Sequence, residues 1–120
     1  MELKRVVVTG LGALTPVGNT VAETWENLVN GVSGAGPITH FDASKFKTQF
    51  ACEVKGFNGA DFIDRKEVRK MDLYTQYAIV AAKEAIADSE MDLEKEDLNK
   101  IGVIYLSLIH ISEPTRHAQI

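Results

Sequence analysis

Arg5-Val-Val-Val-Thr-Gly-Leu-Gly-Ala-Leu-Thr-Pro-Val-Gly-Asn19 is the stretch of sequence that decides the fold. Three valines run into Thr9, and glycines follow at positions 10, 12 and 18, with a proline at 16. The uncharged β-branched run predicts a short strand buried on both faces, and the glycines predict a tight turn after it. Pro16 has no N–H to donate, so the strand must end before it. A strand that opens a chain and runs into a glycine turn predicts an α/β domain.

The glycine turn has two interpretations. Gly10 and Gly12 fit the first two positions of a dinucleotide-binding G-x-G-x-x-G turn. However, Thr15 occupies the third position, and Pro16 stands where the phosphate-binding helix would begin. No acidic residue is suitably placed at the end of a second strand to hold a ribose. These departures favour the second interpretation, a structural turn between a strand and a loop.

Length and composition bound the class of protein. The 120 residues, 45% of them hydrophobic and 25% charged, suit one domain or a piece of a larger one. A net charge of −4 argues against nucleic acid or a membrane surface as the partner of the whole chain. The single cysteine, Cys52, excludes an internal disulfide framework and fits a reducing compartment. No apolar run has the length of a signal peptide or a membrane span, so we expect a cytoplasmic protein.

The first helix follows the glycine turn. Thr20 and Glu23 form a capping box, and apolar residues then recur at helical spacing as far as Val29. Gly31 is placed to end this helix in the left-handed conformation. Residues 31–60 are irregular, with a short strand expected over Phe50–Val54.

Cys52 lies within that expected strand and has two interpretations. As a nucleophile it would need a nearby base or a helix N-terminus to stabilise its thiolate. No histidine stands near it in sequence, and its neighbours are apolar or acidic. We therefore expect a packed, unreactive cysteine.

A cluster of cations follows in the segment 61–72. Lys66, Arg69 and Lys70 are spaced to place three positive charges on one helical face; we call these three residues the basic triplet. Like charges so close repel, which makes the basic triplet a candidate docking patch for an anionic partner. The alternative is a solvated face, relieved by the acidic residues among them.

A long helix and a second strand complete the pattern. Asp72 is placed to cap a helix over residues 73–87, whose first ten residues carry no charge, so that it is expected to be buried on most sides. Small side chains at 78, 81, 82 and 85 would allow close approach of another helix. Residues 88–97 are acidic, and Ile101–Leu106 predicts a second buried strand, parallel to the first through a right-handed crossover. The chain supplies little to cover such a helix, so its apolar surfaces are expected to lie exposed.

Taken together, Val6–Asn19, the Trp25 helix, His40-Phe-Asp42, Phe57-Asn58 and Arg65–Asp72 resemble the N-terminal part of the β-ketoacyl-acyl carrier protein synthases. The resemblance covers about residues 3–105, and it is closest to the elongating condensing enzymes of bacterial type II fatty acid synthesis. It implies an incomplete thiolase-like α/β fold, a mixed sheet with packed helices, which belongs to a five-layered architecture and a homodimer. It also implies an acyltransferase reaction, the decarboxylative Claisen condensation of an acyl thioester with malonyl-acyl carrier protein. No cofactor is implied beyond the phosphopantetheine arm of the carrier.

The resemblance assigns a partner site but no catalytic residue. The family uses one cysteine and two histidines, and none of Cys52, His40, His110 and His117 matches those motifs, so we expect the chain alone to be inactive. The carrier-protein docking face of the family corresponds to Lys66, Arg69 and Lys70. No metal ligand is expected.

The C-terminal tail departs from the family. We divide the chain into a partial synthase domain, residues 1–105, and a tail, residues 106–120, that resembles the translation of a sequencing adapter. A non-catalytic module that binds acyl carrier protein is the alternative function for the whole chain.

Overall fold

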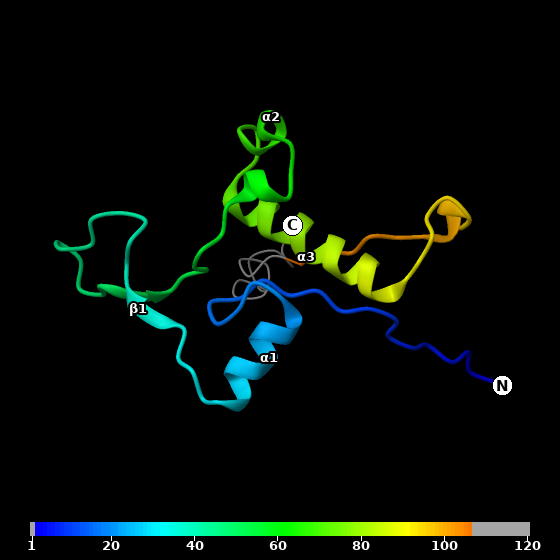
Figure 1. Cartoon of the computed structure of the whole chain (residues 1–120), viewed down its shortest axis with the longest axis horizontal. Coiled ribbons are helices and arrows are strands. Elements are labelled where there is room, and N and C mark those ends of the chain that lie inside the picture. Colours follow the sequence, from blue (N-terminus) through cyan, green and yellow to red (C-terminus); the bar gives the residue numbers. More distant parts are fainter. Residues whose placement is uncertain (1, 107–120) are drawn as a thin grey trace, which may run out of the picture.

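The computed structural model describes residues 2–106 of the chain. In chain order these form α1 (Val21–Val29), β1 (Ala35–Pro37), β2 (Phe50–Cys52), the 3-10 turn η1 (Gly59–Asp61), α2 (Arg65–Val68), α3 (Leu73–Ser89) and the 3-10 turn η2 (Leu98–Lys100). Figure 1 shows α3 across the middle of the molecule, with α2 at one side of it and α1 at the other. The β hairpin and the N-terminal segment extend as separate arms.

The two predicted parallel strands are not formed. Residues 5–9 and 101–106 are extended without strand partners, and within the described residues the only sheet pairs β1 with β2 in antiparallel orientation. Val6, Val103 and Ile104 are each more than 90% exposed. A β-strand needs a neighbouring backbone to receive its hydrogen bonds, and the described chain provides none beside these segments. The prediction of a parallel pair was therefore wrong for this chain.

The first helix begins and ends as its sequence predicts. The Thr20 hydroxyl accepts a hydrogen bond from the Glu23 amide at 3.1 Å, and the Glu23 carboxylate reaches back to the Asn19 amide at 3.4 Å. The helix stops at Asn30, after which Gly31 has φ +70°. A left-handed glycine at this position is the usual way to end a helix.

The expected strand over 50–54 is shorter than predicted. Phe50–Cys52 pairs with Ala35–Pro37, with Gly36 opposite Ala51. The hairpin continues for one bond, from the Ile38 amide to the Gln49 carbonyl at 3.1 Å.

Helix α3 is the longest element, and it runs two residues beyond its predicted end. Asp72 stands at its N-terminus but makes no side-chain capping bond; its carbonyl accepts from the amides of Thr75 and Gln76 instead. Only Gln76 and Val80 of this helix are buried. The expectation of a helix buried on most sides was wrong, because the described chain covers one part of it.

The glycine turn packs directly on α3. A Cβ atom at Gly12 would overlap the Ala81 carbonyl oxygen and lie 2.8 Å from the Ala85 nitrogen. A Cβ at Gly10 would overlap the Ala85 carbonyl oxygen and lie 2.7 Å from the Ser89 nitrogen. The small residues predicted to admit another helix thus admit the glycine turn.

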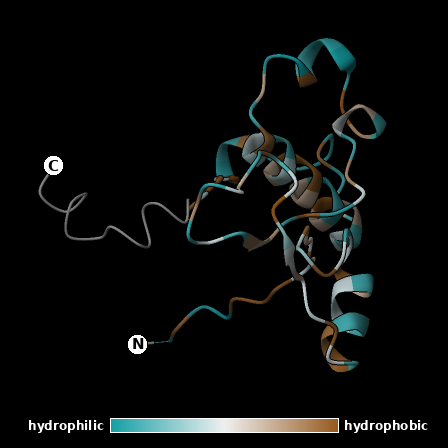
Figure 2. Ribbon diagram, turned by 90° about the vertical axis from the view of Figure 1, so that its left-hand side faces the viewer, coloured by the Kyte–Doolittle hydropathy of each residue, from teal (hydrophilic) through white to brown (hydrophobic). Residues whose placement is uncertain are grey.

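Little of the described chain is enclosed. The buried hydrophobic residues are Ala43 and Val80, and Figure 2 shows apolar ribbon at the surface of α1 and along the opening segment. The Cα radius of gyration is 17.8 Å, whereas a compact domain of this length has roughly 13 Å. Among the described residues no helix is both long and apolar enough to cross a membrane.

Candidate functional site

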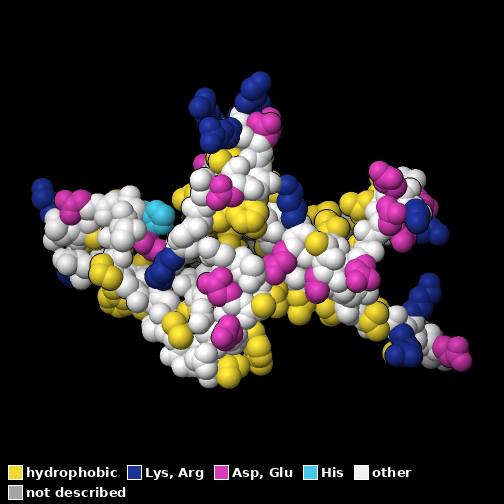
Figure 3. All heavy atoms as spheres, in the orientation of Figure 1, with side chains coloured by type: hydrophobic (Ala, Val, Ile, Leu, Met, Phe, Trp, Pro, Cys, Tyr) yellow, Lys and Arg dark blue, Asp and Glu magenta, His cyan; other side chains and the backbone are white. Residues whose placement is uncertain are grey.

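The basic triplet lies on and just beyond α2, and all three side chains are exposed. In Figure 3 the Lys and Arg side chains around α2 project from the molecule as one positive cluster. Helix α2 comprises only Arg65–Val68, so Lys66 lies within it, Arg69 caps it and Lys70 follows. The sequence predicts one helical face for the triplet. In the structure the three residues are shared between the single turn of α2 and the turn that follows it.

Local hydrogen bonds start and end this short helix. The Asp64 carboxylate accepts from the Lys66 amide at 2.8 Å and caps the N-terminus. After α2, the Lys70 amide donates to the Glu67 carbonyl and the Met71 amide to the Val68 carbonyl. Lys70 also pairs with the Glu67 carboxylate at 3.4 Å. Among residues 2–106 no carboxylate lies within 4.0 Å of the Lys66 ammonium or the Arg69 guanidinium, so both charges face solvent.

Helix α3 contacts the segment that leads into α2. The Lys83 ammonium donates to the Phe62 carbonyl at 2.9 Å. Phe57 packs edge-on against Tyr77, with ring centroids 5.0 Å apart, and stacks on Phe62 at 6.1 Å. Burial raises the pKa of the Tyr77 phenol, and the charge of Glu53 adds to the shift.

Two carboxylates of α3 hold the glycine turn. Glu84 accepts from the Ala13 amide at 3.0 Å with one oxygen and from the Val21 amide at 2.9 Å with the other. Asp88 accepts from the Leu11 amide at 2.9 Å. Val21 is the first residue of α1, so Glu84 joins the glycine turn and the start of α1 to one point on α3.

The geometry of the turn is not that of a dinucleotide-binding loop. Gly10 and Gly12 face the α3 backbone, and α1 begins only at Val21, so no helix N-terminus follows the glycines directly. The glycines serve close packing, which agrees with the structural interpretation of the turn.

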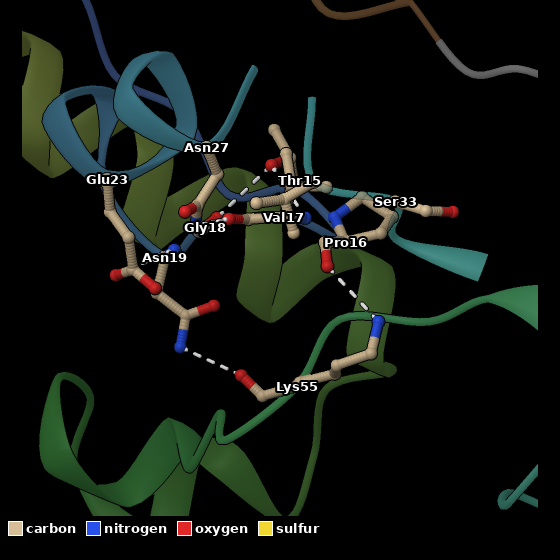
Figure 4. A pocket seen from close by; sticks show the side chains of 10 residues that line it. Thr15, Pro16, Val17, Gly18, Asn19, Glu23, Asn27, Ser33 and Lys55 are labelled. Carbon is tan, nitrogen blue, oxygen red and sulfur yellow. Dashed lines mark hydrogen bonds between the residues drawn. The ribbon is translucent and has the colours of Figure 1, made fainter. Parts of the chain in front are cut away.

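Beyond the glycines, the turn lines a cavity of about 210 Å³. Figure 4 shows Lys55 reaching across it, where its ammonium donates to the Pro16 carbonyl at 3.1 Å. The same ammonium donates to the carbonyls of Gly34 at 2.8 Å and Glu53 at 3.0 Å, and the Asn19 amide group donates to the Lys55 carbonyl. Lys55 therefore ties the turn to both sides of the β hairpin. With its ammonium satisfied by three carbonyls, it is a structural cation.

Glu53 organises the start of the hairpin loop. The Thr39 hydroxyl donates to its carboxylate at 2.7 Å and the Thr39 amide at 3.0 Å. These bonds, the hydroxyl first, hold the pKa of Glu53 below its ordinary value. His40 lies 3.9 Å from the same carboxylate, so the one histidine within the described residues contacts this loop and not the cysteine.

No catalytic constellation is assembled by the described residues. Cys52 is exposed on β2, which corrects the expectation that it is packed, and no hydrogen bond joins its sulfur to residues 2–106. Among these residues no group of three or more metal-ligating side chains is close enough to hold a metal ion. His110 and His117 lie outside the described residues.

Sequence reasoning missed three side chains that organise this region. They are Lys55, Gln76 and Glu84, each a polar residue whose side chain bonds backbone groups of another segment. Gln76 and Glu84 had one available indication, since they are polar residues within the apolar helix predicted over 73–87. Lys55 had none, because its partners are carbonyls, which every residue carries.

The chain belongs to the β-ketoacyl synthases. The model of that family, described as the beta-ketoacyl synthase N-terminal domain, matches residues 3–116. Among individual proteins, the 3-oxoacyl-[acyl-carrier-protein] synthase 2 of Staphylococcus aureus (strain COL) is 51% identical over 100 residues, 83% of this chain and 24% of the relative. The synthase 2 of Synechocystis sp. is 46% identical over 104 residues, 87% of this chain and 25% of the relative. The chain thus spans about a quarter of the length of the curated relatives it matches.

Solved structures agree with this assignment. The ishigamide ketosynthase/chain length factor superimposes with a TM-score of 0.67 and 36% identity over 73% of this chain and 22% of its own. A type II polyketide synthase acyl-carrier protein in complex with its ketosynthase, bound to the hexaketide, gives a TM-score of 0.63 and 28% identity. That match covers 98% of this chain and 31% of the other. The chain therefore resembles the N-terminal region of a ketosynthase, with three helices and few strands in the part described.

Proposed function

We propose that this chain is the opening part of a condensing enzyme of fatty acid elongation. The observation that carries the proposal is the 51% identity over 100 residues to a 3-oxoacyl-[acyl-carrier-protein] synthase 2, within a family match that spans most of the chain. The reaction is a decarboxylative Claisen condensation of an acyl thioester with malonyl-acyl carrier protein.

The chemistry needs groups that the described residues do not assemble. An acyl group moves to a cysteine thiolate, malonyl-carrier protein loses CO2, and the resulting carbanion attacks the thioester. Two histidines stabilise the developing enolate oxygen. Neither Cys52 nor His40 corresponds to these groups, so the 120-residue chain is inactive alone, and the reactive residues belong to the part of the relatives that it does not span.

The same proposal predicts how these residues fold in the complete enzyme. In a complete thiolase-like enzyme, α3 is covered on its remaining sides, and residues 5–9 and 101–106 pair as strands of a mixed sheet. Support comes from the exposed valines and isoleucines of those two segments, whose β-branched side chains suit a sheet buried on both faces. Residues 1–105 are the domain part of the chain, and residues 106–120 are a tail. The complete enzyme is a homodimer.

The basic triplet is the docking surface for acyl carrier protein. Support comes from the exposure of Lys66, Arg69 and Lys70 and from the projection of the Lys and Arg side chains around α2 as one cluster (Figure 3). Of the three, only Lys70 pairs its charge with a carboxylate among the described residues, that of Glu67. One of the similar solved structures is itself a complex of an acyl-carrier protein with its ketosynthase. An acidic carrier protein would be attracted by such a cluster, and salt would screen the attraction.

Titration of the 120-residue chain with acyl carrier protein at low salt tests the docking surface. The double variant Lys66→Glu with Arg69→Glu is expected to lose binding. The control is Lys95→Glu with Lys100→Glu, which makes the same change in net charge at the other end of α3. Equal affinity of the two double variants would remove the basic triplet as the docking surface.

A second candidate function, a non-catalytic module that binds carrier protein, shares this surface. Sequencing the source DNA beyond the codon for Tyr105 separates the two. A downstream reading frame with a cysteine nucleophile segment supports the condensing enzyme, whereas a natural stop after the printed sequence supports the module.

A further inference from the structure

Helix α2 is too short to hold the basic triplet in place by itself. It comprises four residues, and a single helical turn does not persist in water without other contacts. Its capping residue, Asp64, satisfies an amide at its N-terminal end. The Glu67 and Val68 carbonyls at its C-terminal end accept from the amides of Lys70 and Met71, so these bonds close the turn on itself and do not attach it to the rest of the protein.

Gln76 of α3 supplies that attachment. Its side-chain nitrogen donates to the Met71 carbonyl at 3.1 Å and to the Val68 carbonyl at 3.4 Å. Gln76 is 6% exposed and is the one buried polar residue among those described. One amide group therefore binds the last residue of α2 and the turn that follows Lys70.

Packing fixes the orientation of this amide. Gly59 of η1 lies over its oxygen side, where a Cβ atom would overlap Oε1 and stand 3.1 Å from Cδ. The same Cβ would lie 3.5 Å from a methyl group of Val68. The glycine thus leaves room for Gln76 between η1 and α2, and the amide cannot swing away without opening that contact.

We propose that Gln76 is the positioning residue of the basic triplet: it fixes Lys66, Arg69 and Lys70 on the body of the protein and so sets the affinity for an anionic protein partner. Its use in partner binding rests on the function proposed above. Gln76 is buried and cannot touch the partner itself, so it acts through the backbone of α2. A glutamine suits the role because one uncharged nitrogen carries two donors; a glutamate would face the two carbonyls with acceptors.

The variant Gln76→Leu keeps much of the volume and removes both donors. Its matched control is Gln49→Leu, because the Gln49 nitrogen also donates to two backbone carbonyls, those of Ser44 and Phe46, both at 3.3 Å. Gln49 is exposed and belongs to the hairpin loop. The two variants therefore remove the same number of bonds of the same kind at two places.

Hydrogen exchange of the full 120-residue chain, at low micromolar concentration, measures the positioning directly. Amides of residues 66–71 should exchange about tenfold faster or more in Gln76→Leu, since the two lost bonds together stabilise by about one factor of ten. They should be unchanged in Gln49→Leu. Unchanged exchange in Gln76→Leu overturns the inference.

Gly59→Ala keeps the inference testable if Gln76→Leu loosens the whole chain. This variant leaves the glutamine in place and pushes its amide aside. Faster exchange confined to residues 66–71 supports the positioning role. Exchange equal to that of the unsubstituted chain overturns it.

Gln76→Glu tests the two hydrogen bonds through the pH dependence of hydrogen exchange, which would not change if residue 76 only filled space. Ionised, the glutamate opposes the two carbonyls; protonated, it donates to one of them, and burial raises its pKa. Protection of residues 66–71, corrected for intrinsic rates, should recover between pH 8 and pH 5 in this variant alone. No recovery contradicts the assigned hydrogen bonds.

Binding of acyl carrier protein at low salt separates this inference from the proposed function. We expect Gln76→Leu to weaken binding about three- to tenfold, and Gln49→Leu to leave it unchanged. If the unsubstituted chain does not bind the carrier while Gln76→Leu still frees residues 66–71, the docking function fails and the positioning role of Gln76 stands. If the carrier binds both variants equally well, the inference fails and the docking function stands.

Discussion

Gly12→Ala is the sharpest test of how the opening turn is held. The added Cβ would overlap the Ala81 carbonyl oxygen and lie 2.8 Å from both the Ala81 carbonyl carbon and the Ala85 nitrogen. These are backbone atoms inside a helix, so they cannot rotate away. The turn itself must lift from α3.

The cost of lifting the turn can be worked from its contacts. Overpacking of this kind costs about 1–3 kcal/mol. The bonds from the Leu11 amide to Asp88 and from the Ala13 amide to Glu84 would be strained or lost as well, at about 1 kcal/mol each for partly exposed groups. Alanine restricts the unfolded chain and returns about 0.4–1 kcal/mol. The net loss is about 2–4.5 kcal/mol, or roughly a 30- to 2,000-fold change in the opening equilibrium.

Hydrogen exchange at Leu11 and Ala13 is the assay. Both amides should exchange faster by about that factor in Gly12→Ala. Gly102→Ala is the control, because nothing lies within 4 Å of a Cβ at Gly102. If Gly12→Ala exchanges at the unsubstituted rate, or if both variants change equally, the close approach of the turn to α3 is refuted.

Three further predictions concern the rest of the chain. Folding lowers the pKa of Glu53, so the ionised carboxylate stabilises the folded state fully above its ordinary pKa, and this stabilisation is lost as the pH falls through the lowered value. Protection of the Thr39 amide against hydrogen exchange should therefore fall in acid, below about pH 4. Thr39→Val should diminish that pH dependence. Lys55→Met should make the turn at 15–19 and the segment 53–55 more susceptible to limited proteolysis, and Lys55→Arg should restore part of the protection; equal cleavage of Lys55→Met and the unsubstituted chain would contradict the structural role of the ammonium. The chain should associate as its concentration rises, because Trp25, Val103 and Ile104 are more than 60% exposed; a sharp cooperative melt of a monomer would contradict this.

Local features could be predicted from the sequence because their causes are local. Thr20, Glu23 and Gly31 define the ends of α1 through bonds and torsions within a few residues of each other. Helix α3 could be placed because it is long and uninterrupted. The family could be identified because several motifs stand in register over most of the chain.

The strands and the bonds of Lys55, Gln76 and Glu84 could not be predicted, because they depend on how separate segments of the chain pack together. A strand over 5–9 depends on partners distant in sequence, and the described residues provide none. The bonds of Lys55 and Glu84 connect segments as far as 71 residues apart, as from Glu84 to Ala13. Those of Gln76 reach carbonyls eight and five residues earlier, beyond the end of its own helix. Their acceptors and donors are backbone groups, which leave no mark in the sequence. The basic triplet was visible as a pattern of charge, but what holds it became visible only in three dimensions.

The two hydrogen bonds that the Glu84 carboxylate accepts have a consequence for sequence variation. Both oxygens of one carboxylate are used, one by Ala13 and one by Val21, so the seven residues between them must span a fixed gap. An insertion or deletion within 14–20 would pull one amide out of reach. We expect relatives with a loop of different length there to carry another side chain at the position of Glu84, so that loop length and residue type vary together.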